Sequence, residues 1–134
     1  MGVDARLVKR LPATRESAAF ELDVHLKADS GVTVLFGPSG SGKTLTLNCL
    51  AGFVRPDAGR IVVNDELYFD AATHVNRSPQ YRRCGYIFQD HALFPHMNVR
   101  DNLLFAAPGN GRRVSELLEA FELTSLAARK PAQL

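Results

Sequence analysis

Long hydrophobic runs are missing from this sequence of 134 residues. The longest unbroken apolar runs, such as residues 103–107, are far shorter than the roughly 20 residues that a membrane-spanning helix needs. A protein with this pattern would work at a membrane only if a partner supplied the spanning segments. Strong charge is missing too, because the net charge is +2 and the pI is about 8.7. That balance is too mild to indicate a nucleic-acid-binding face, so we expect no nucleic acid among the partners.

Cysteine is scarce, with only Cys49 and Cys84 in the chain. Their spacing is not that of a metal-ligand pair. We therefore interpret both as small, buried, apolar side chains in a reducing compartment.

Alternation of polar and apolar residues predicts an antiparallel strand at residues 18–26. One face of this stretch would carry Ala18, Phe20, Leu22, Val24 and Leu26. His25 falls on the opposite, polar face, which favours a solvated side chain over a ligand. Residues 3–11 show a weaker pattern and are expected to pair with this strand.

A short apolar run at residues 32–36 reads as a strand buried on both faces, as in a parallel sheet. A helix is predicted over residues 44–51, with Gly52 as its C-terminal cap. A second strand of the buried type is predicted at residues 85–88. The expected class is therefore α/β.

Three further elements complete the predicted layout. Two short apolar runs flank Asn64-Asp65, a pair that suits a tight turn, so a hairpin is expected there. Helices are predicted at residues 99–107 and 114–123. The second has an apolar stripe at helical spacing, which favours a core-facing surface over a cofactor site. The stripe consists of Val114, Leu117, Leu118 and Phe121.

The stretch GPSGSGKT at residues 37–44 matches the phosphate-binding pattern G-x-x-x-x-G-K-[ST]. Glycines let the backbone approach a ligand closely, and the following helix directs its positive end at a phosphate. Lys43 would reach the β- and γ-phosphates, and the Thr44 hydroxyl would ligate Mg²⁺. The predicted phosphate-binding residues are Gly37, Pro38, Ser39, Gly40, Ser41, Gly42, Lys43 and Thr44. The alternative is a glycine-rich turn before an ordinary helix.

A phosphate-binding loop alone does not identify the reaction, because kinases, GTPases, motors and transport ATPases all use one. Hydrolysis also needs an acidic residue at the end of a second buried strand and a group that orients water. Asp65-Glu66 follows an apolar run, but Asn64-Asp65 is needed for a turn. We therefore reject Asp65-Glu66 as the acidic site.

Residues 82–103, RRCGYIFQDHALFPHMNVRDNL, supply a second motif. Together with GPSGSGKT and residues 50–61, this stretch closely resembles the ATP-binding subunits of ABC transporters. Phe88-Gln89 matches the Q-loop of that family, 46 residues after Lys43. Within the family, the importer ATPases for molybdate are the most similar, while sulfate, polyamine and iron importers share much of the LFPH region.

The resemblance implies ATP and Mg²⁺ as ligands, with Gln89 approaching Mg²⁺ or the attacking water. It also implies a peripheral protein at the cytoplasmic face of the cell membrane. Its partners would be a membrane-spanning permease, a second ATPase subunit in a head-to-tail dimer and, indirectly, a substrate-binding protein. Phe94, Pro95 and His96 would face the permease, although Phe94 could equally pack inside the protein.

This sequence departs from the family pattern in two places. The family stacks adenine on an early aromatic residue, whereas here only Leu11, Pro12 and Phe20 lie near the expected position. The chain also ends in PAQL, which in the family directly precedes the signature SGGQ. We therefore expect the N-terminal part of a longer subunit, divided into a partial nucleotide-binding core with a β subdomain (residues 1–88) and a Q-loop with the start of a helical subdomain (residues 89–134).

Three functions remain open at this stage. The first is an importer ATPase that is active as a whole subunit, with little or no hydrolysis by this chain alone. The second is a nucleotide-binding module that does not hydrolyse ATP. The third is a small kinase, which is weakened by the Gln89 loop and by the lack of a recognisable acceptor-binding motif.

Overall fold

The computed structural model describes residues 2–89 and 92–134. It divides into two compact units, Met1–Tyr86 and Ile87–Leu134, which are described separately below. Asp90 and His91, which belong to the second sequence motif, lie outside the described residues.

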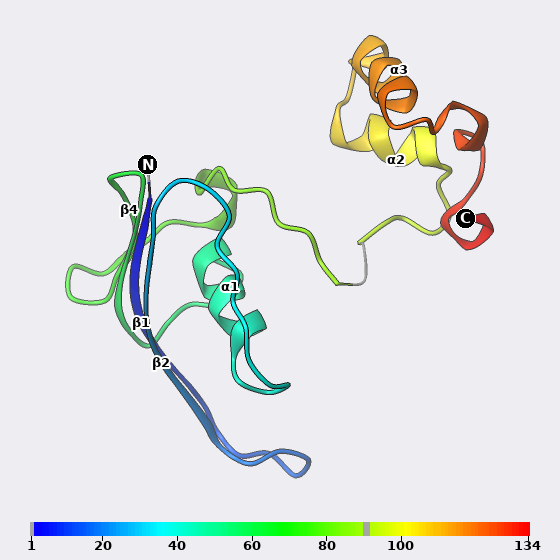
Figure 1. Cartoon of the computed structure of the whole chain (residues 1–134). Coiled ribbons are helices and arrows are strands. Elements are labelled where there is room, and N and C mark those ends of the chain that lie inside the picture. The colour runs from blue at the N-terminus through cyan, green and yellow to red at the C-terminus, as the bar shows by residue number, and fades with distance from the viewer. Residues whose placement is uncertain (1, 90–91) are drawn as a thin grey trace. The chain divides into compact units, whose positions relative to one another are not determined.

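The first unit is built on a five-stranded antiparallel sheet with the strand order β2-β1-β3-β4-β5 (Figure 1). The strands are β1 (Val3–Leu11), β2 (Phe20–Ala28), β3 (Ala58–Val63), β4 (Glu66–Asp70) and β5 (Val75–Asn76). A short 3-10 helix, η1 (Pro79–Tyr81), follows the last strand. The sheet therefore forms almost entirely from residues on either side of the phosphate-binding stretch and its helix.

The predicted pairing of the first two strands is confirmed. β1 and β2 align from Val3 opposite Ala28 to Leu11 opposite Phe20, without a bulge. Exposure alternates along β2, where Leu22 is buried and both of its neighbours are exposed. His25 lies on the exposed face as predicted, and its Nε2 atom is 3.2 Å from Asp4 Oδ1.

The predicted hairpin at Asn64-Asp65 is confirmed as well. Both residues have positive φ angles, 50° and 65°, which are typical of a two-residue type I′ turn between β3 and β4. Asx residues tolerate this conformation better than most side chains do. The turn uses Asp65, and Glu66 pairs with Arg77, so the structure agrees with the rejection of these carboxylates as the acidic site.

The core of the first unit lies between the sheet and helix α1 (Lys43–Ala51). Its buried members are Ala5, Leu7, Leu22, Cys49, Ile61, Tyr68 and Phe69. α1 ends at Gly52, which has a left-handed conformation with φ 90° and donates its N–H to the carbonyls of Asn48 and Cys49. The predicted helix and its glycine cap are therefore confirmed, and packing against the sheet fixes the helix that follows the phosphate-binding stretch.

The prediction of two strands buried on both faces is wrong for this structure. Residues 32–36 and 85–88 belong to no sheet. Val32, Phe36 and Ile87 are 94%, 98% and 92% exposed. A strand persists only where a neighbour completes its ladder of hydrogen bonds, and no described residue does so for either segment.

The two cysteines differ from the prediction in one respect. Cys49 is fully buried on α1, and burial raises the pKa of its thiol, as expected for an inert core residue. Cys84 is exposed, because it precedes the predicted strand at 85–88 that is not formed. The prediction of two buried cysteines therefore holds only for Cys49.

The second unit consists of α2 (Val99–Ala106) and α3 (Gly111–Ala120), followed by the short 3-10 helices η2 (Thr124–Leu126) and η3 (Pro131–Gln133). Asn98 and Asn110 cap the two α-helices by accepting the N–H groups of Asp101 and Arg113. Val114 and Leu118 are buried as predicted. Phe121 is exposed, because α3 ends one residue before it. Across the described part of the chain, no helix has the length and hydrophobicity needed to cross a bilayer.

Candidate functional site

The predicted phosphate-binding residues form a turn that leads directly into α1. Its members are Gly37, Pro38, Ser39, Gly40, Ser41, Gly42, Lys43 and Thr44. The Ser41 N–H donates to the Pro38 carbonyl at 3.3 Å, which closes the turn. Gly40 and Gly42 have φ angles of 80° and 90°, a region that other residues adopt only with strain. The first N–H groups of α1 have no partner within the helix, so the turn ends in a set of donors suited to an anion.

The Lys43 ammonium group lies over this turn. Its Nζ atom donates to the carbonyl oxygens of Gly37 at 2.8 Å and Pro38 at 2.7 Å, and to Ser41 Oγ at 3.3 Å. These contacts hold a positive charge above the turn at the N-terminal end of α1. Thr44 is the next residue, and its side chain is exposed. A phosphate near the turn would therefore meet a fixed cation and a free hydroxyl.

Gly42 allows the turn to pack closely against β2. A Cβ atom at this position would lie 2.6 Å from Leu22 Cδ1 and 3.2 Å from Phe20 Cζ. The Gly42 carbonyl also accepts both the N–H and the Oγ1 hydroxyl of the buried Thr46. Gly42 is therefore needed for two reasons. It adopts the left-handed conformation before α1, and it lies too close to Leu22 and Phe20 for any side chain to fit.

A depression of about 670 Å³ adjoins the turn. It is lined by Leu11, Phe20, Ser39, Gly40, Gly42, Lys43, Thr44 and Leu45. Leu11 and Phe20 are cross-strand partners at the end of the β1–β2 pair, so strand register brings two apolar side chains beside the phosphate-binding residues. Sequence reasoning left the base contact open, and the pairing of residues 3–11 with residues 18–26 was the signal that could have joined Leu11 to Phe20.

Gln89 lies in an exposed turn of the second unit. Its amide can accept from a water molecule and ligate a cation. The role assigned to it from the resemblance stays a prediction.

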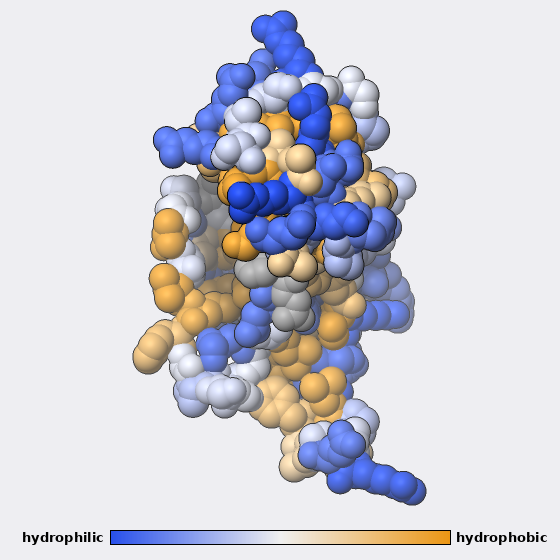
Figure 2. Space-filling view, turned by 90° about the vertical axis from the view of Figure 1, so that its right-hand side faces the viewer, coloured by the Kyte–Doolittle hydropathy of each residue, from blue (hydrophilic) through white to orange (hydrophobic). Residues whose placement is uncertain are grey.

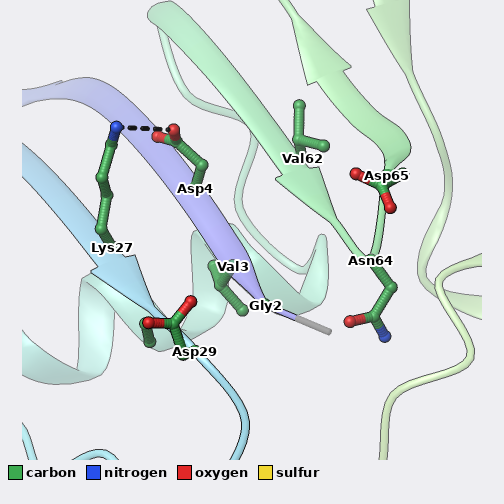
Figure 3. Close-up of a pocket in the computed structure, with 9 residues that line it drawn as sticks. Gly2, Val3, Asp4, Lys27, Asp29, Val62, Asn64 and Asp65 are labelled. Atoms are coloured by element: carbon green, nitrogen blue, oxygen red, sulfur yellow. Dashed lines mark ion pairs between the residues drawn. The ribbon is translucent and has the colours of Figure 1, made fainter.

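A separate depression of about 330 Å³ lies at the opposite end of β1 (Figure 3). Its charged side chains include Asp4, Asp29, Asp65 and Lys27. The Asp4 carboxylate is hydrogen-bonded to His25 and paired with Lys27 at 3.2 Å, and these contacts lower the pKa of Asp4. Within residues 2–89 and 92–134, no group of three or more histidine, cysteine, aspartate or glutamate side chains could hold a metal ion. Because three of its charged side chains are carboxylates and Lys27 is paired with one of them, this depression is less suited to bind an anion than the glycine turn is.

An aromatic cluster lies before α2 in the second unit. The Phe94 ring packs edge-on against His96 and Phe105, with ring centroids 6.0 and 4.6 Å away. Asn102 fixes the backbone beneath it, because its amide donates to the carbonyls of Phe94, Met97 and Asn98 and accepts the Phe94 N–H. Sequence reasoning assigned no role to Asn102. Phe94 is 38% exposed, so it is partly packed and partly available to a partner.

Hydrophobic side chains reach the surface elsewhere as well. Figure 2 shows hydrophobic residues among hydrophilic ones on the surface that it draws. The largest exposed fractions belong to the two segments that lack a sheet neighbour, residues 32–36 and 85–88.

Comparisons with known proteins identify the family of this chain. A family model described as ABC transporter matches residues 21–134. Two curated relatives, each named Molybdenum import ATP-binding protein ModC, come from Rhodospirillum rubrum and Paramagnetospirillum magneticum and are 43% and 44% identical to this chain. The alignments cover 90% and 92% of this chain but 34% and 36% of the relatives. The chain thus spans about a third of their length.

Solved structures support the same fold. A dimeric, post-hydrolysis structure of the ATP-binding cassette MJ0796 bound to ADP and Pi aligns with a TM-score of 0.73 and 26% identity. The alignment covers 98% of this chain and 62% of that one. The predicted class, a P-loop NTPase core with an antiparallel β subdomain, is confirmed by this likeness. The resemblance inferred from the two sequence motifs is also confirmed, and the chain belongs to the ABC transporter family.

Proposed function

We propose that this chain is the nucleotide-binding part of an ATPase subunit that drives molybdate import. The observation that carries the proposal is the glycine turn at the start of α1, with the Lys43 ammonium fixed above it. The identity of 43% and 44% to proteins named for molybdenum import favours molybdate over other solutes. Hydrolysis and transport are proposed for the whole subunit.

In this proposal the residues of the turn bind the phosphates of ATP. Lys43 would exchange its bonds to the loop carbonyls for bonds to the β- and γ-phosphates, and Thr44 would ligate Mg²⁺ through its exposed hydroxyl. Mg²⁺ would neutralise the phosphates and polarise the γ-phosphoryl group. Gln89 would approach the metal or the attacking water.

Leu11 and Phe20 would contact the adenine base. Both side chains line the depression that contains Lys43 and Thr44, and a stacked aromatic ring contributes about 1–3 kcal/mol to base binding. Phe20→Ala is therefore expected to weaken Mg²⁺-ATP binding roughly tenfold, while binding of Mg²⁺-tripolyphosphate changes less than about twofold. Calorimetric titration of both ligands measures the difference.

Tyr81→Ala is the matched control for this prediction. It removes an exposed aromatic ring from η1 that does not line the depression. It should leave both affinities unchanged. Equal losses for ATP and tripolyphosphate in Phe20→Ala would contradict a base contact, because they would indicate damage to the phosphate site.

Gln89→Ala tests the transport function in the complete subunit, assembled with its permease. Because a glutamine that orients water or Mg²⁺ acts mainly after binding, we expect molybdate uptake to fall about tenfold or more while the Kd for Mg²⁺-ATP stays within about threefold. Uptake of labelled molybdate and of sulfate is measured side by side. Unchanged uptake in Gln89→Ala would remove the role of this residue, and preferred uptake of sulfate would replace molybdate as the solute.

We further propose that Phe94, Pro95 and His96 dock against a permease at the cytoplasmic face of the membrane. An aromatic side chain held by a fixed backbone is a typical centre of a protein interface, and Asn102 fixes this backbone through four hydrogen bonds. A second ATPase subunit would complete the nucleotide site in a dimer, and a substrate-binding protein would act through the permease. Residues 1–88 would form the nucleotide-binding core with the β subdomain, and residues 89–134 the Q-loop and the start of the helical subdomain.

A further inference from the structure

Arg82 is fully buried, and none of the assigned functions uses it. Its guanidinium reaches the C-terminal end of α1, where one nitrogen donates to the carbonyls of Cys49 and Leu50 at 2.8 Å each. Nε donates to the Arg77 carbonyl at 2.8 Å, and the other terminal nitrogen to Asn76 Oδ1 at 3.2 Å. The group thus joins α1 to the segment that follows β4.

Backbone carbonyls and an aromatic ring, and no carboxylate among the described residues, stabilise the buried guanidinium charge of Arg82. Among residues 2–89 and 92–134, no carboxylate forms an ion pair with it. The last carbonyls of a helix carry a partial negative charge, which complements a guanidinium. The Tyr68 ring also faces it, with Arg82 Cζ 5.7 Å from the ring centroid, and the Tyr68 hydroxyl donates to the Arg82 carbonyl.

Gly52 leaves the space that this contact needs. A Cβ atom at position 52 would lie 2.6 Å from Arg82 Nε and 2.9 Å from Arg82 Cζ. The glycine that caps α1 therefore also admits the arginine.

A second attachment holds the same segment to α1. The Tyr86 hydroxyl is hydrogen-bonded to Asn48 Oδ1 at 2.6 Å, and the Tyr86 ring packs edge-on against Phe53 with centroids 5.1 Å apart. Residues 82–86 are therefore fixed to α1 through Arg82 at one end and Tyr86 at the other. Two attachments prevent the segment from pivoting about either contact alone.

We propose that Arg82 is a positioning residue that makes α1 and residues 82–86 respond as one unit to a ligand bound at the N-terminal end of α1. α1 has nine residues, begins at Lys43 and ends where Arg82 binds. A nucleotide that stabilises the start of this helix would therefore also stabilise the contact at its end. Residues 82–86 lead directly to Gln89, so Arg82 would transmit occupancy of the phosphate site toward the Q-loop.

This inference rests on the proposed nucleotide site, and Cys49 offers a separate readout for it. The Cys49 thiol is buried in the core between α1 and the sheet, and the Cys49 carbonyl accepts from Arg82, so an opening that releases the end of α1 from both the sheet and residues 82–86 would expose the thiol. Cys84→Ser leaves Cys49 as the only cysteine. The rate at which a thiol reagent modifies Cys49 then reports local opening, and calorimetry reports Mg²⁺-ATP binding independently.

In the Cys84→Ser chain, Mg²⁺-ATP at about 100 times its Kd should slow Cys49 modification by about tenfold or more, because it binds the closed state. Adding Arg82→Met should speed modification in the absence of nucleotide by about tenfold. It should also reduce the protection by Mg²⁺-ATP to less than about twofold, with the Kd within about threefold. Arg83→Met is the matched control, since Arg83 is exposed, and it should behave like its parent.

Different results would overturn different parts of the account. If Arg82→Met opens faster but keeps the full protection by Mg²⁺-ATP, Arg82 stabilises the fold without transmitting occupancy, and the proposal is wrong. If Arg82→Met does not fold, Arg82→Lys tests the proposal, because an ammonium can donate to the Cys49 and Leu50 carbonyls and should restore an intermediate degree of protection. No protection in Arg82→Lys, with the Kd for Mg²⁺-ATP unchanged, would contradict the proposal, because this variant keeps a donor for the two α1 carbonyls. Absence of Mg²⁺-ATP binding in the parent would reject the nucleotide site itself.

Discussion

Lys43→Ala is expected to weaken Mg²⁺-ATP binding by about 10- to 100-fold, because one charge-assisted hydrogen bond to phosphate contributes about 1.5–3 kcal/mol. The Lys43 ammonium lies 2.7 and 2.8 Å from two loop carbonyls, directly above the turn that leads into α1. ADP, which lacks the γ-phosphate, should lose less affinity than ATP. Calorimetric titration of both nucleotides measures the loss.

The fold should tolerate Lys43→Ala, because the carbonyls of Gly37 and Pro38 can turn to water when the ammonium is removed. The midpoint of thermal unfolding should therefore change by only a few degrees. Lys27→Ala is the matched control, since it removes an exposed lysine paired with Asp4 at the opposite end of β2. An ATP affinity of Lys43→Ala equal to that of Lys27→Ala would contradict the role of Lys43.

Gly42→Ala should have the largest effect on stability of any single change in the turn. The new Cβ would lie 2.6 Å from Leu22 Cδ1, and the backbone would keep a φ of 90°. Left-handed strain costs about 1–2 kcal/mol, and overpacking adds about 1–3 kcal/mol. We expect a loss of about 2–5 kcal/mol in the free energy of unfolding, measured by urea denaturation, which is a large part of the total stability of a small domain.

Gly40→Ala separates the two causes of that loss. Gly40 also has a positive φ, 80°, but a Cβ there would meet nothing within 4 Å. Gly40→Ala should therefore show the conformational strain alone, about 1–2 kcal/mol. If the two variants are equally destabilised, the close packing of the turn against β2 has no energetic importance.

The sequence predicted the antiparallel part of the fold well because its signals are local. Period-two alternation determines which face of β2 is buried, and Asn64-Asp65 adopts the positive φ angles that a two-residue hairpin needs. Gly52 ends α1 for the same kind of reason. Each of these features depends on residues that are neighbours in the chain or in one hairpin.

The segments 32–36 and 85–88 could not be predicted in this way. An apolar run indicates that a strand would be buried on both faces, but the burial requires neighbouring strands and covering helices that the described residues do not supply. The chain spans 34–36% of the length of the two curated relatives, so their alignment leaves most of each relative unmatched. The apolar pattern therefore indicated burial in a sheet, but the described residues form no strands beside these two segments.

The sequence alone predicted the phosphate-binding turn, but it predicted only part of the side chains that surround the turn. GPSGSGKT specifies the turn, Lys43 and the start of α1 through residues that are contiguous in sequence. The apolar pair beside it depends on strand register, which joins Leu11 to Phe20. The attachment of Arg82 to the end of α1 joins residues 32 and 33 positions apart, and no local pattern indicates such a contact.

Every function proposed above depends on the turn at residues 37–44 binding the phosphates of a nucleotide. The most direct test is a titration of the ¹⁵N-labelled chain with Mg²⁺-ATP, followed by the NMR shifts of its backbone amides. We predict saturable shifts concentrated at residues 39–44, with Leu11 and Phe20 also shifting for ATP but not for tripolyphosphate. Unchanged amides at residues 39–44, or shifts concentrated around Asp4 and Asn64 in the other depression, would contradict this prediction.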